Sequence, residues 1–324
     1  MSGLAEFSLI KQYFEKCTHS RDDVLLGIGD DCAIVQSKDN QQLAVSVDTL
    51  VEGIHFSPDV DAYSLGHKSL AVSLSDLAAM GATPAWFTLA LTLPDINPPW
   101  LTDFANGLAN IANQHHIALI GGDTTRGPLS ITIQVHGFVS AKKALRRDGA
   151  QPGDDIYVSG TLGDAGAGLK LKQRELRSDD LLINAKAENF IEQRLDRPIP
   201  RVQLGLNIVN IATAAIDISD GLVADLGHIL EKSHVGAEIN IDALPLSPQL
   251  LTLVNRQQAE HFALYSGDDY ELCFTAPLEK QSELTRMACT KIGTVNESGK
   301  LTFIQQGQTI ELTGAGYEHF STEH

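Results

Sequence analysis

The chain has 324 residues, of which 43% are hydrophobic and 27 are glycine, so it can supply two ordinary domains with a core each. Its 41 acidic residues against 24 basic ones give a formal net charge of −17. A chain this acidic is a poor candidate for binding nucleic acid or an anionic membrane through a basic surface, and it suits a protein that holds metal ions.

Targeting and cysteine signals are absent from the sequence. Residues 1–16 carry Glu6, Lys11, Glu15 and Lys16, which a signal peptide's apolar core excludes, and no segment reaches the roughly eighteen apolar residues of a membrane helix. The four cysteines lie far apart without a C-x-x-C pair, so neither a zinc site nor a disulfide framework is expected. We therefore expect a cytoplasmic protein with reduced thiols and no membrane partner.

The first half of the chain predicts several strands and three helices. Apolar residues at three- and four-residue steps predict a short helix over 7–17, and alternation predicts a strand over 43–48. In that strand Ser46 and Asp48 share one face, and both can offer oxygen to the same ligand. Further helices are expected at 61–80 and 100–115, and further strands at 86–93, 117–120 and 130–139, with 121–126 as a loop.

The expected helix over 61–80 is nearly apolar all round, which predicts a buried helix that Asp61 caps and Gly81 ends. Ser69, Ser73 and Asp76 lie on one stripe of it. An aspartate on a buried helix needs a partner, and the sequence leaves open whether Asp76 is a satisfied core residue or a ligand.

The second half begins after a turn signal at 151–154, which predicts domains over 1–148 and 149–324. A strand is expected at 156–159, helices at 179–195 and 201–212, a strand from 215 that leads through an acidic loop into a helix, and short strands from 291 onward. The glycine-rich stretch 160–168 has two interpretations: a backbone cradle for phosphate, or a tight strand-to-helix turn.

Acids repeatedly follow apolar strand-like runs or end helices. Oxygen-only sets rich in carboxylates suit hard cations, above all Mg²⁺ when phosphates complete the coordination, and they predict metal-assisted phosphoryl chemistry. The alternative is a set of solvated turns, because Gly and Asp are common turn residues. The positions concerned are Asp30, Asp31, Asp48, Asp76, Asp123, Asp217, Asp220, Asp268 and Asp269.

Seven segments of the chain carry a family resemblance: EFSLI at 6–10, GIGDDCA at 27–33, SVDTLVEGIHF at 46–56, SLSDLAAMGATPAW at 73–86, GGDTTRG at 121–127, AIDISDGL at 215–222 and GDDYELCF at 267–274. Together they resemble the thiamine-monophosphate kinase family, part of the aminoimidazole ribonucleotide synthetase superfamily. The resemblance implies ATP-dependent conversion of thiamine monophosphate to thiamine diphosphate. It also implies a two-domain α+β fold, with an N-terminal mixed sheet with helices and a C-terminal α/β sandwich, and a homodimer whose N-terminal sheets pair into a barrel.

The resemblance also implies roles for individual residues. Several Mg²⁺ ions would be held by Asp30, Asp31, Ser46, Val47 (through its carbonyl), Asp48, Asp76, Asp123, Asp217 and Asp220. The nucleotide would lie at Gly122, Asp123, Arg147 and Ser219, and thiamine monophosphate at His55, Asp268 and Tyr317. Domain 1–148 would bind metal and ATP and dimerise, and domain 149–324 would carry the glycine-rich loop and substrate contacts.

Two positions depart from the family pattern. Val47 stands where the family often has threonine, and Asp268 stands where it often has glutamate, so a shorter carboxylate must reach the substrate. No general base is expected, because a phosphate monoester loses its second proton near a pH of about 6.

Other functions stay open at this point. The chain is also compatible with another ATP-using member of the superfamily, similar to selenophosphate synthetase or aminoimidazole ribonucleotide synthetase, or with a non-catalytic Mg-nucleotide-binding regulator. Selenophosphate synthetase would have a reactive cysteine and a lysine in a glycine-rich N-terminal segment, and the carbamoyl-dehydrating hydrogenase-maturation enzyme would have a C-terminal cysteine. The sequence shows neither pattern. ATP turnover in the presence of thiamine monophosphate separates a kinase from a regulator.

Overall fold

The computed structural model describes residues 10–14, 21–26, 33–37, 40–141, 143–176 and 181–310. The chain forms two compact units, one of residues 1–77 and 82–144, the other of residues 78–81 and 145–324. The first unit therefore ends shortly before the boundary expected near residue 148. The roles expected for the two domains stay predictions.

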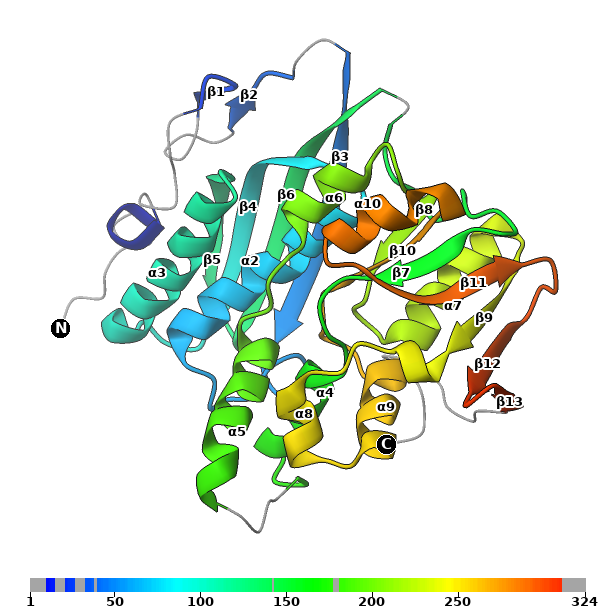
Figure 1. Ribbon diagram of the computed structural model, residues 1–324. Helices are drawn as coiled ribbons and strands as arrows, with labels where there is room; N and C mark the ends of the chain where they lie inside the picture. Colours follow the sequence, from blue (N-terminus) through cyan, green and yellow to red (C-terminus); the bar gives the residue numbers. More distant parts are fainter. Residues whose placement is uncertain are drawn as a thin grey trace. The chain divides into compact units, whose positions relative to one another are not determined.

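The first unit is built on a four-stranded mixed sheet in the order β3-β6-β4-β5 (Figure 1). β6 pairs antiparallel with β3 and β4, and β4 pairs parallel with β5. The expected strands and helices are confirmed; the strands are longer than the periodicity gave, and the two helices differ from their expected bounds by one or two residues at each end. These are β3 Gln41–Val51, α2 Ala62–Ala79, β4 Thr83–Leu93, α3 Pro98–Gln114, β5 Ala118–Arg126 and β6 Ser130–Ser140.

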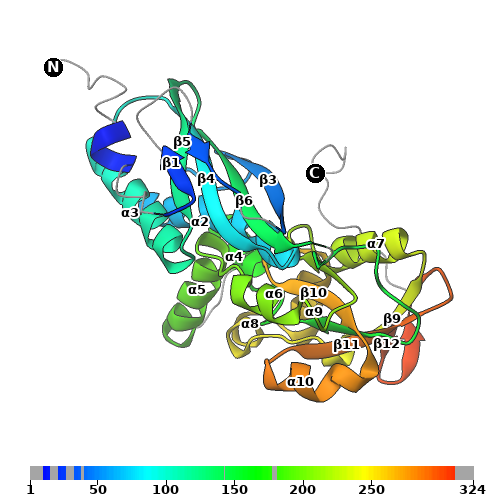
Figure 2. The same cartoon turned by 90° about the horizontal axis from the view of Figure 1, so that it is seen from above.

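Helices α2 and α3 lie on the same side of this sheet (Figures 1 and 2) and pack closely on each other. Gly66 of α2 and Gly107 of α3 make the close approach possible: a Cβ at Gly66 would lie 2.0 Å from the Phe104 carbonyl oxygen, and one at Gly107 would lie 1.9 Å from that of Tyr63. Only glycine fits at either position.

The start of the chain is described in three short pieces. A π-helical turn spans Ile10–Phe14, and the pair β1 Val24–Leu26 and β2 Ile34–Val35 is antiparallel. Val24 and Ala33 pack against Trp86 and its neighbours on the sheet. Only this turn of the helix expected over 7–17 is described; the other residues of that prediction lie outside the described ranges.

One expected loop is wrong: residues 121–126 continue strand β5. They pair in parallel with Thr88–Leu93 of β4 after a register shift near Ile120. Glycine permits this, because a Cβ at Gly122 would lie 1.9 Å from the Leu89 carbonyl oxygen. Asp123 thus lies within an edge strand and not after its end.

The second unit contains a seven-stranded sheet in the order β13-β12-β9-β11-β7-β10-β8. Helices α7 and α9 cover one face, where Leu226, Ile229 and Ala263 join the buried core (Figure 2). Its strands are β7 Asp155–Val158, β8 Ala214–Asp217, β9 Gly236–Asn240, β10 Leu272–Ala276, β11 Thr290–Asn296, β12 Leu301–Gln305 and β13 Gln308–Ile310.

The helices of the second unit also differ in length from those expected. The α-helix expected over 201–212 ends at Ile208, and the helix after β7 begins at Asp164, inside the glycine-rich stretch. The bounds are α4 Asp164–Lys172, α5 Leu181–Asp196, α6 Val202–Ile208, α7 Leu222–Ser233, α8 Pro248–Leu253, α9 Arg256–Tyr265 and α10 Gln281–Arg286, with 3₁₀ turns η3 Ile241–Ala243 and η4 Leu278–Lys280.

Candidate functional site

The first unit brings together three of the predicted metal ligands. Ser46 and Asp48 share one face of β3, as the alternation predicts. The structure turns this face toward α2, which carries Asp76. The Ser46 hydroxyl donates a hydrogen bond to Asp76 Oδ2. The structure therefore joins one residue of the strand to the acid of the helix through a hydrogen bond.

Asp48 has a carboxylate oxygen with no hydrogen-bond partner. Within the described part of the chain, its Oδ2 is buried and unpaired, and Ser73 Oγ lies nearby without a hydrogen bond of normal geometry. Loss of solvation raises the pKa of Asp48, and the Ser73 hydroxyl and the His55 ring lower it by less. A buried, unsatisfied carboxylate oxygen is costly unless a cation or a donor arrives.

Asp123 lies on the other side of this sheet. The register across the strands pairs Asp123 with Ala90, then Thr132, then Thr49, which is the face opposite to Asp48. Val47 is on the same face as Thr49, because neighbouring strand residues alternate. The structure thus places Asp123 and Asp48 apart within this sheet, and the described residues hold no ready-made cluster of three metal-ligating side chains.

His55 lies in the turn after β3, as expected. The ring Nδ1 of His55 accepts a hydrogen bond from the Val51 backbone N–H at 3.0 Å, and the backbone N–H of His55 donates to the Val51 carbonyl at 3.0 Å. Because Nδ1 is an acceptor, Nε2 carries the proton in the neutral ring. His55 is therefore positioned as a hydrogen-bond donor and not as a proton acceptor.

The second unit gathers another group of predicted residues in the connection between β8 and α7. Asp217 ends β8 and is buried, and Ser219 and Asp220 follow on the turn. Asp225, one turn into α7, accepts the backbone N–H groups of Ser219 and Asp220, both at 3.0 Å. Burial raises the pKa of Asp225 to about 7. No sequence pattern predicted that Asp225 holds this turn in place.

The segment Gly267–Glu271 lies against this turn. Asp268 N–H donates to the Ser219 carbonyl, and a Cβ at Gly267 would lie 2.1 Å from that same oxygen. Asp268 is half-buried, has a φ of 68°, and accepts a hydrogen bond from the Tyr270 hydroxyl at 3.0 Å. The structure therefore brings Asp268 next to the Ser219–Asp220 turn.

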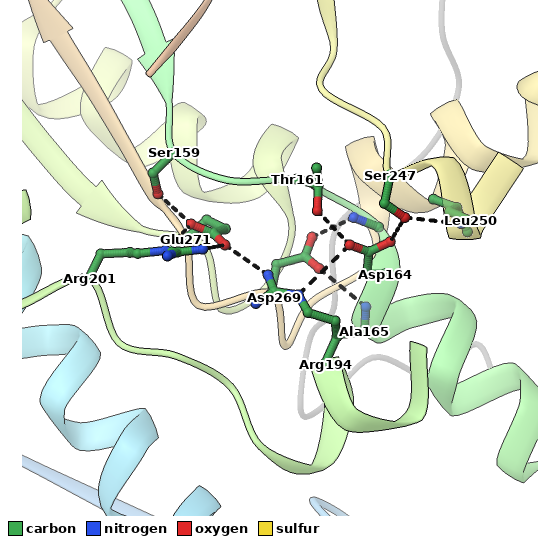
Figure 3. A network of polar contacts seen from close by, with 11 residues as sticks. Ser159, Thr161, Asp164, Ala165, Arg194, Arg201, Ser247, Leu250, Asp269 and Glu271 are labelled. Carbon is green, nitrogen blue, oxygen red and sulfur yellow. Dashed lines mark hydrogen bonds and ion pairs between the residues drawn. The ribbon is translucent and has the colours of Figure 1, made fainter. Parts of the chain in front are cut away.

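The neighbouring acids Asp269 and Glu271 are buried in a polar network (Figure 3). Glu271 accepts hydrogen bonds from Ser159, Arg194 and Arg201. Asp269 accepts the backbone N–H of Gly163 at 2.7 Å and that of Ala165 at 3.3 Å, at the first turn of α4. The two residues are thus structural anchors of the segment that carries Asp268.

The same contacts decide between the two interpretations of stretch 160–168. Asp269 already occupies two amides of the α4 N-terminus, and Gly163 and Gly166 allow α4 to approach α9. A Cβ at Gly163 would lie 2.6 Å from the Ala263 nitrogen, and one at Gly166 would lie 2.2 Å from Ser266 Cβ. The tight strand-to-helix turn describes this segment, and a phosphate cradle at these two amides does not.

We expect Gly163→Ala to lower the free energy of unfolding by about 1–3 kcal/mol, because its φ of 83° and its close contacts both resist a side chain. Gly227→Ala in α7 is the matched control, with open space around its Cβ, and it should raise stability by about 0.5–1 kcal/mol. Urea unfolding measures both. A Gly163→Ala protein of normal stability with weakened ATP binding would restore the phosphate interpretation.

Asp269 predicts a pH dependence of stability. Burial raises its pKa to about 8, whereas an unfolded aspartate titrates near about 3.9. The folded chain therefore keeps a proton that the unfolded chain releases, so this contribution is complete below about pH 4 and is lost as the pH rises to about 8. Asp269 can lower the free energy of unfolding by at most about 1.4 kcal/mol for each pH unit in this range.

Comparing the wild type with Asp269→Asn isolates this group. Unfolding free energies without ligand, measured from pH 6 to pH 9, should fall more steeply for the wild type. Parallel profiles for the two proteins would show that Asp269 is ionised throughout.

The remaining predicted residues are described in part. Arg147 is exposed, and its carbonyl accepts a hydrogen bond from Ser233 Oγ at 2.8 Å. Asp30, Asp31 and Tyr317 lie outside the described residues. In the part of the chain that is described, no helix is long and apolar enough to cross a membrane.

Comparison with known proteins identifies the family. Residues 29–139 match the AIR synthase related protein, N-terminal domain, and residues 151–306 match the AIR synthase related protein, C-terminal domain. A curated relative, thiamine-monophosphate kinase of Escherichia coli (strain K12), is 49% identical over 325 residues, with 98% of each chain covered. The chain belongs to the thiamine-monophosphate kinase family.

Solved structures of this family share the fold. Thiamine-monophosphate kinase from Stenotrophomonas maltophilia K279a has a TM-score of 0.86 at 48% identity and covers 95% of this chain and 98% of its own. AaThiL, solved in complex with AMPPCP and TMP, has a TM-score of 0.77 at 32% identity and covers 99% of this chain and 98% of its own. The family, the fold class and the kinase class expected from the sequence are confirmed.

Proposed function

We propose that this chain catalyses the ATP-dependent phosphorylation of thiamine monophosphate to thiamine diphosphate. The observation that carries the proposal is the buried, unpaired Oδ2 of Asp48 beside the Ser46–Asp76 pair, in a chain that is 49% identical to a thiamine-monophosphate kinase. The relative AaThiL binds AMPPCP and TMP, which supports ATP and thiamine monophosphate as the two substrates.

Magnesium fits the oxygen set of the first unit. The Asp48 oxygen lacks a donor in the described part of the chain, and Asp48, Asp76 and Ser46 offer oxygen atoms only. When bound, Mg²⁺ neutralises phosphate charge and favours in-line transfer. We propose that Mg²⁺ ions are held by Asp30, Asp31, Ser46, Val47, Asp48, Asp76, Asp123, Asp217 and Asp220.

The chain's own residues bind and orient the two substrates. The acceptor phosphate is largely ionised near neutral pH, so no side chain has to remove a proton from it. His55 supports this scheme, because its Nδ1 is engaged by the Val51 N–H and its Nε2–H can donate to a substrate oxygen. We propose Asp268 and Tyr317 as further contacts of thiamine monophosphate, and Gly122, Asp123, Arg147 and Ser219 as contacts of the nucleotide.

We also propose a homodimer formed through strand β3. Leu43, Val45 and Val47 are 47%, 52% and 59% exposed, and they form an apolar stripe on an edge strand of the sheet. An exposed apolar edge strand calls for a partner. In this proposal residues 1–148 bind metal and ATP and dimerise, and residues 149–324 contribute substrate contacts.

The experiment that tests the proposed function is ADP release with thiamine monophosphate, thiamine and aminoimidazole ribonucleotide-pathway substrates side by side. We expect ADP and thiamine diphosphate in equal amounts with thiamine monophosphate alone. Binding of ATP and Mg²⁺ without ADP release would instead make the chain a regulator, and turnover only with another acceptor would assign it to a different member of the superfamily.

A further inference from the structure

The segment Gly267–Glu271 is held in one conformation by contacts from the rest of its unit. Two of its non-glycine residues have left-handed backbones, Asp268 at a φ of 68° and Tyr270 at 49°. Such residues persist only where surrounding structure fixes them. Here the backbone N–H groups of Asp268 and Tyr270 donate to the carbonyls of Ser219 and Ile218, both at 2.9 Å.

Side-chain anchors alternate with the two left-handed residues. Asp269 is 1% exposed and holds the first turn of α4, and Glu271 is fully buried between Arg194 and Arg201 (Figure 3). The anchors point into the unit, whereas Asp268 stays half-buried. Of the three acids in this segment, Asp268 is therefore the one that is not fully buried.

Tyr270 adds a contact that the anchoring does not need. Its ring is nearly buried, at 9% exposure, so packing fixes where its hydroxyl lies. That hydroxyl donates to Asp268 Oδ1 at 3.0 Å. A hydrogen bond to a charged acceptor is stronger than one between neutral groups, so it holds a short side chain more firmly in one rotamer.

We propose that Tyr270 is a positioning residue for substrate binding: its hydroxyl fixes the Asp268 carboxylate in the orientation that pairs with the cationic rings of thiamine monophosphate. This inference rests on the proposed function. It also explains how an aspartate serves at a position where a longer glutamate is common, because a short carboxylate held in place loses less freedom when the substrate binds.

The test is Tyr270→Phe, which keeps the ring and removes the hydroxyl. We expect the KM for thiamine monophosphate to rise about 5- to 15-fold, which is less than the full loss of one hydrogen bond to a charged group, because the Asp268 carboxylate itself remains. The KM for ATP and kcat should stay within about twofold of the wild type. Direct binding of thiamine monophosphate by calorimetry should weaken by the same factor.

The chain offers a matched control in Tyr157→Phe. Tyr157 donates to Asp155 Oδ2 at 3.3 Å, so it is a second tyrosine–aspartate pair two residues apart in the same unit. It is buried in the sheet and has no place in the proposed site. This variant should lower the melting temperature without changing the KM for thiamine monophosphate.

A double-mutant cycle separates positioning from simple stabilisation. If Tyr270 acts through Asp268, adding Tyr270→Phe to Asp268→Asn should change the KM for thiamine monophosphate no further. Additive effects, an unchanged KM in Tyr270→Phe, or equal rises in both KM values with a lowered melting temperature would overturn the inference. A wild-type chain that releases no ADP would overturn the proposed function itself, and this inference with it.

Discussion

Asp48→Asn should lower kcat by about 100-fold or more while the ligand-free protein melts at the same or a higher temperature. The loss follows because about 3 kcal/mol of transition-state stabilisation corresponds to that factor, and a metal-holding carboxylate supplies several kcal/mol. The stability follows because Asp48 Oδ2 is buried and has no hydrogen-bond partner among the residues that the structure describes, and because desolvation raises the pKa of this carboxyl. A group with a raised pKa opposes folding once it is charged, and asparagine removes that charge.

Two measurements check this prediction. Mg²⁺ and ATP should raise the melting temperature of the wild type and have much less effect on Asp48→Asn. Asp61→Ala is the control: Asp61 accepts the Ser64 N–H at the start of α2, so its loss should cost about 0.5–2 kcal/mol and leave kcat unchanged. An Asp48→Asn protein that unfolds, with a wild type insensitive to Mg²⁺ and ATP, would make Asp48 a structural acid.

Glu271→Gln should lower the free energy of unfolding by about 3–5 kcal/mol. Glu271 is fully buried, with Arg194 Nη2 at 2.8 Å and Arg201 Nε at 2.6 Å. Removing its charge leaves two largely buried guanidinium groups without their shared carboxylate, and Arg194 keeps an ion pair with Asp164 at 3.8 Å. An uncompensated buried charge is among the largest single costs a protein can carry.

Denaturant unfolding measures this effect, and Glu175→Gln is its control. Glu175 pairs with Lys170 at 2.8 Å on the surface, where both side chains are exposed, so its loss should cost less than about 1 kcal/mol. Equal stability changes in the two variants would show that the buried network contributes no more than a surface ion pair.

Local patterns predicted much of this fold. Alternation in 43–48 predicted that Ser46 and Asp48 share one face, and the apolar pattern over 61–80 predicted a buried helix that carries Asp76. These predictions succeeded because the period of a strand or helix is contained in a few neighbouring residues.

Contacts between distant segments could not be predicted in this way. Asp268 and Asp269 are neighbours of the same type, yet Asp269 caps a helix that begins about a hundred residues earlier, and Asp268 turns away from it. The left-handed backbone of Asp268 and the buried arginines around Glu271 determine which acids of this segment are buried. Similarly, nothing local showed that Gly121 and Gly122 continue a strand, because their pairing partner is β4.

The apolar stripe on β3 also affects how the purified protein behaves. A lone protomer would present Leu43, Val45 and Val47 on an eleven-residue strand that lies at the edge of its sheet in the described part of the chain, and such an edge is a template for aggregation. The net charge of −17 keeps such molecules apart near neutral pH, but it disappears as the pH falls to the isoelectric point, which is about 4.9. Dilute, mildly acidic solutions should therefore precipitate the protein before they unfold it.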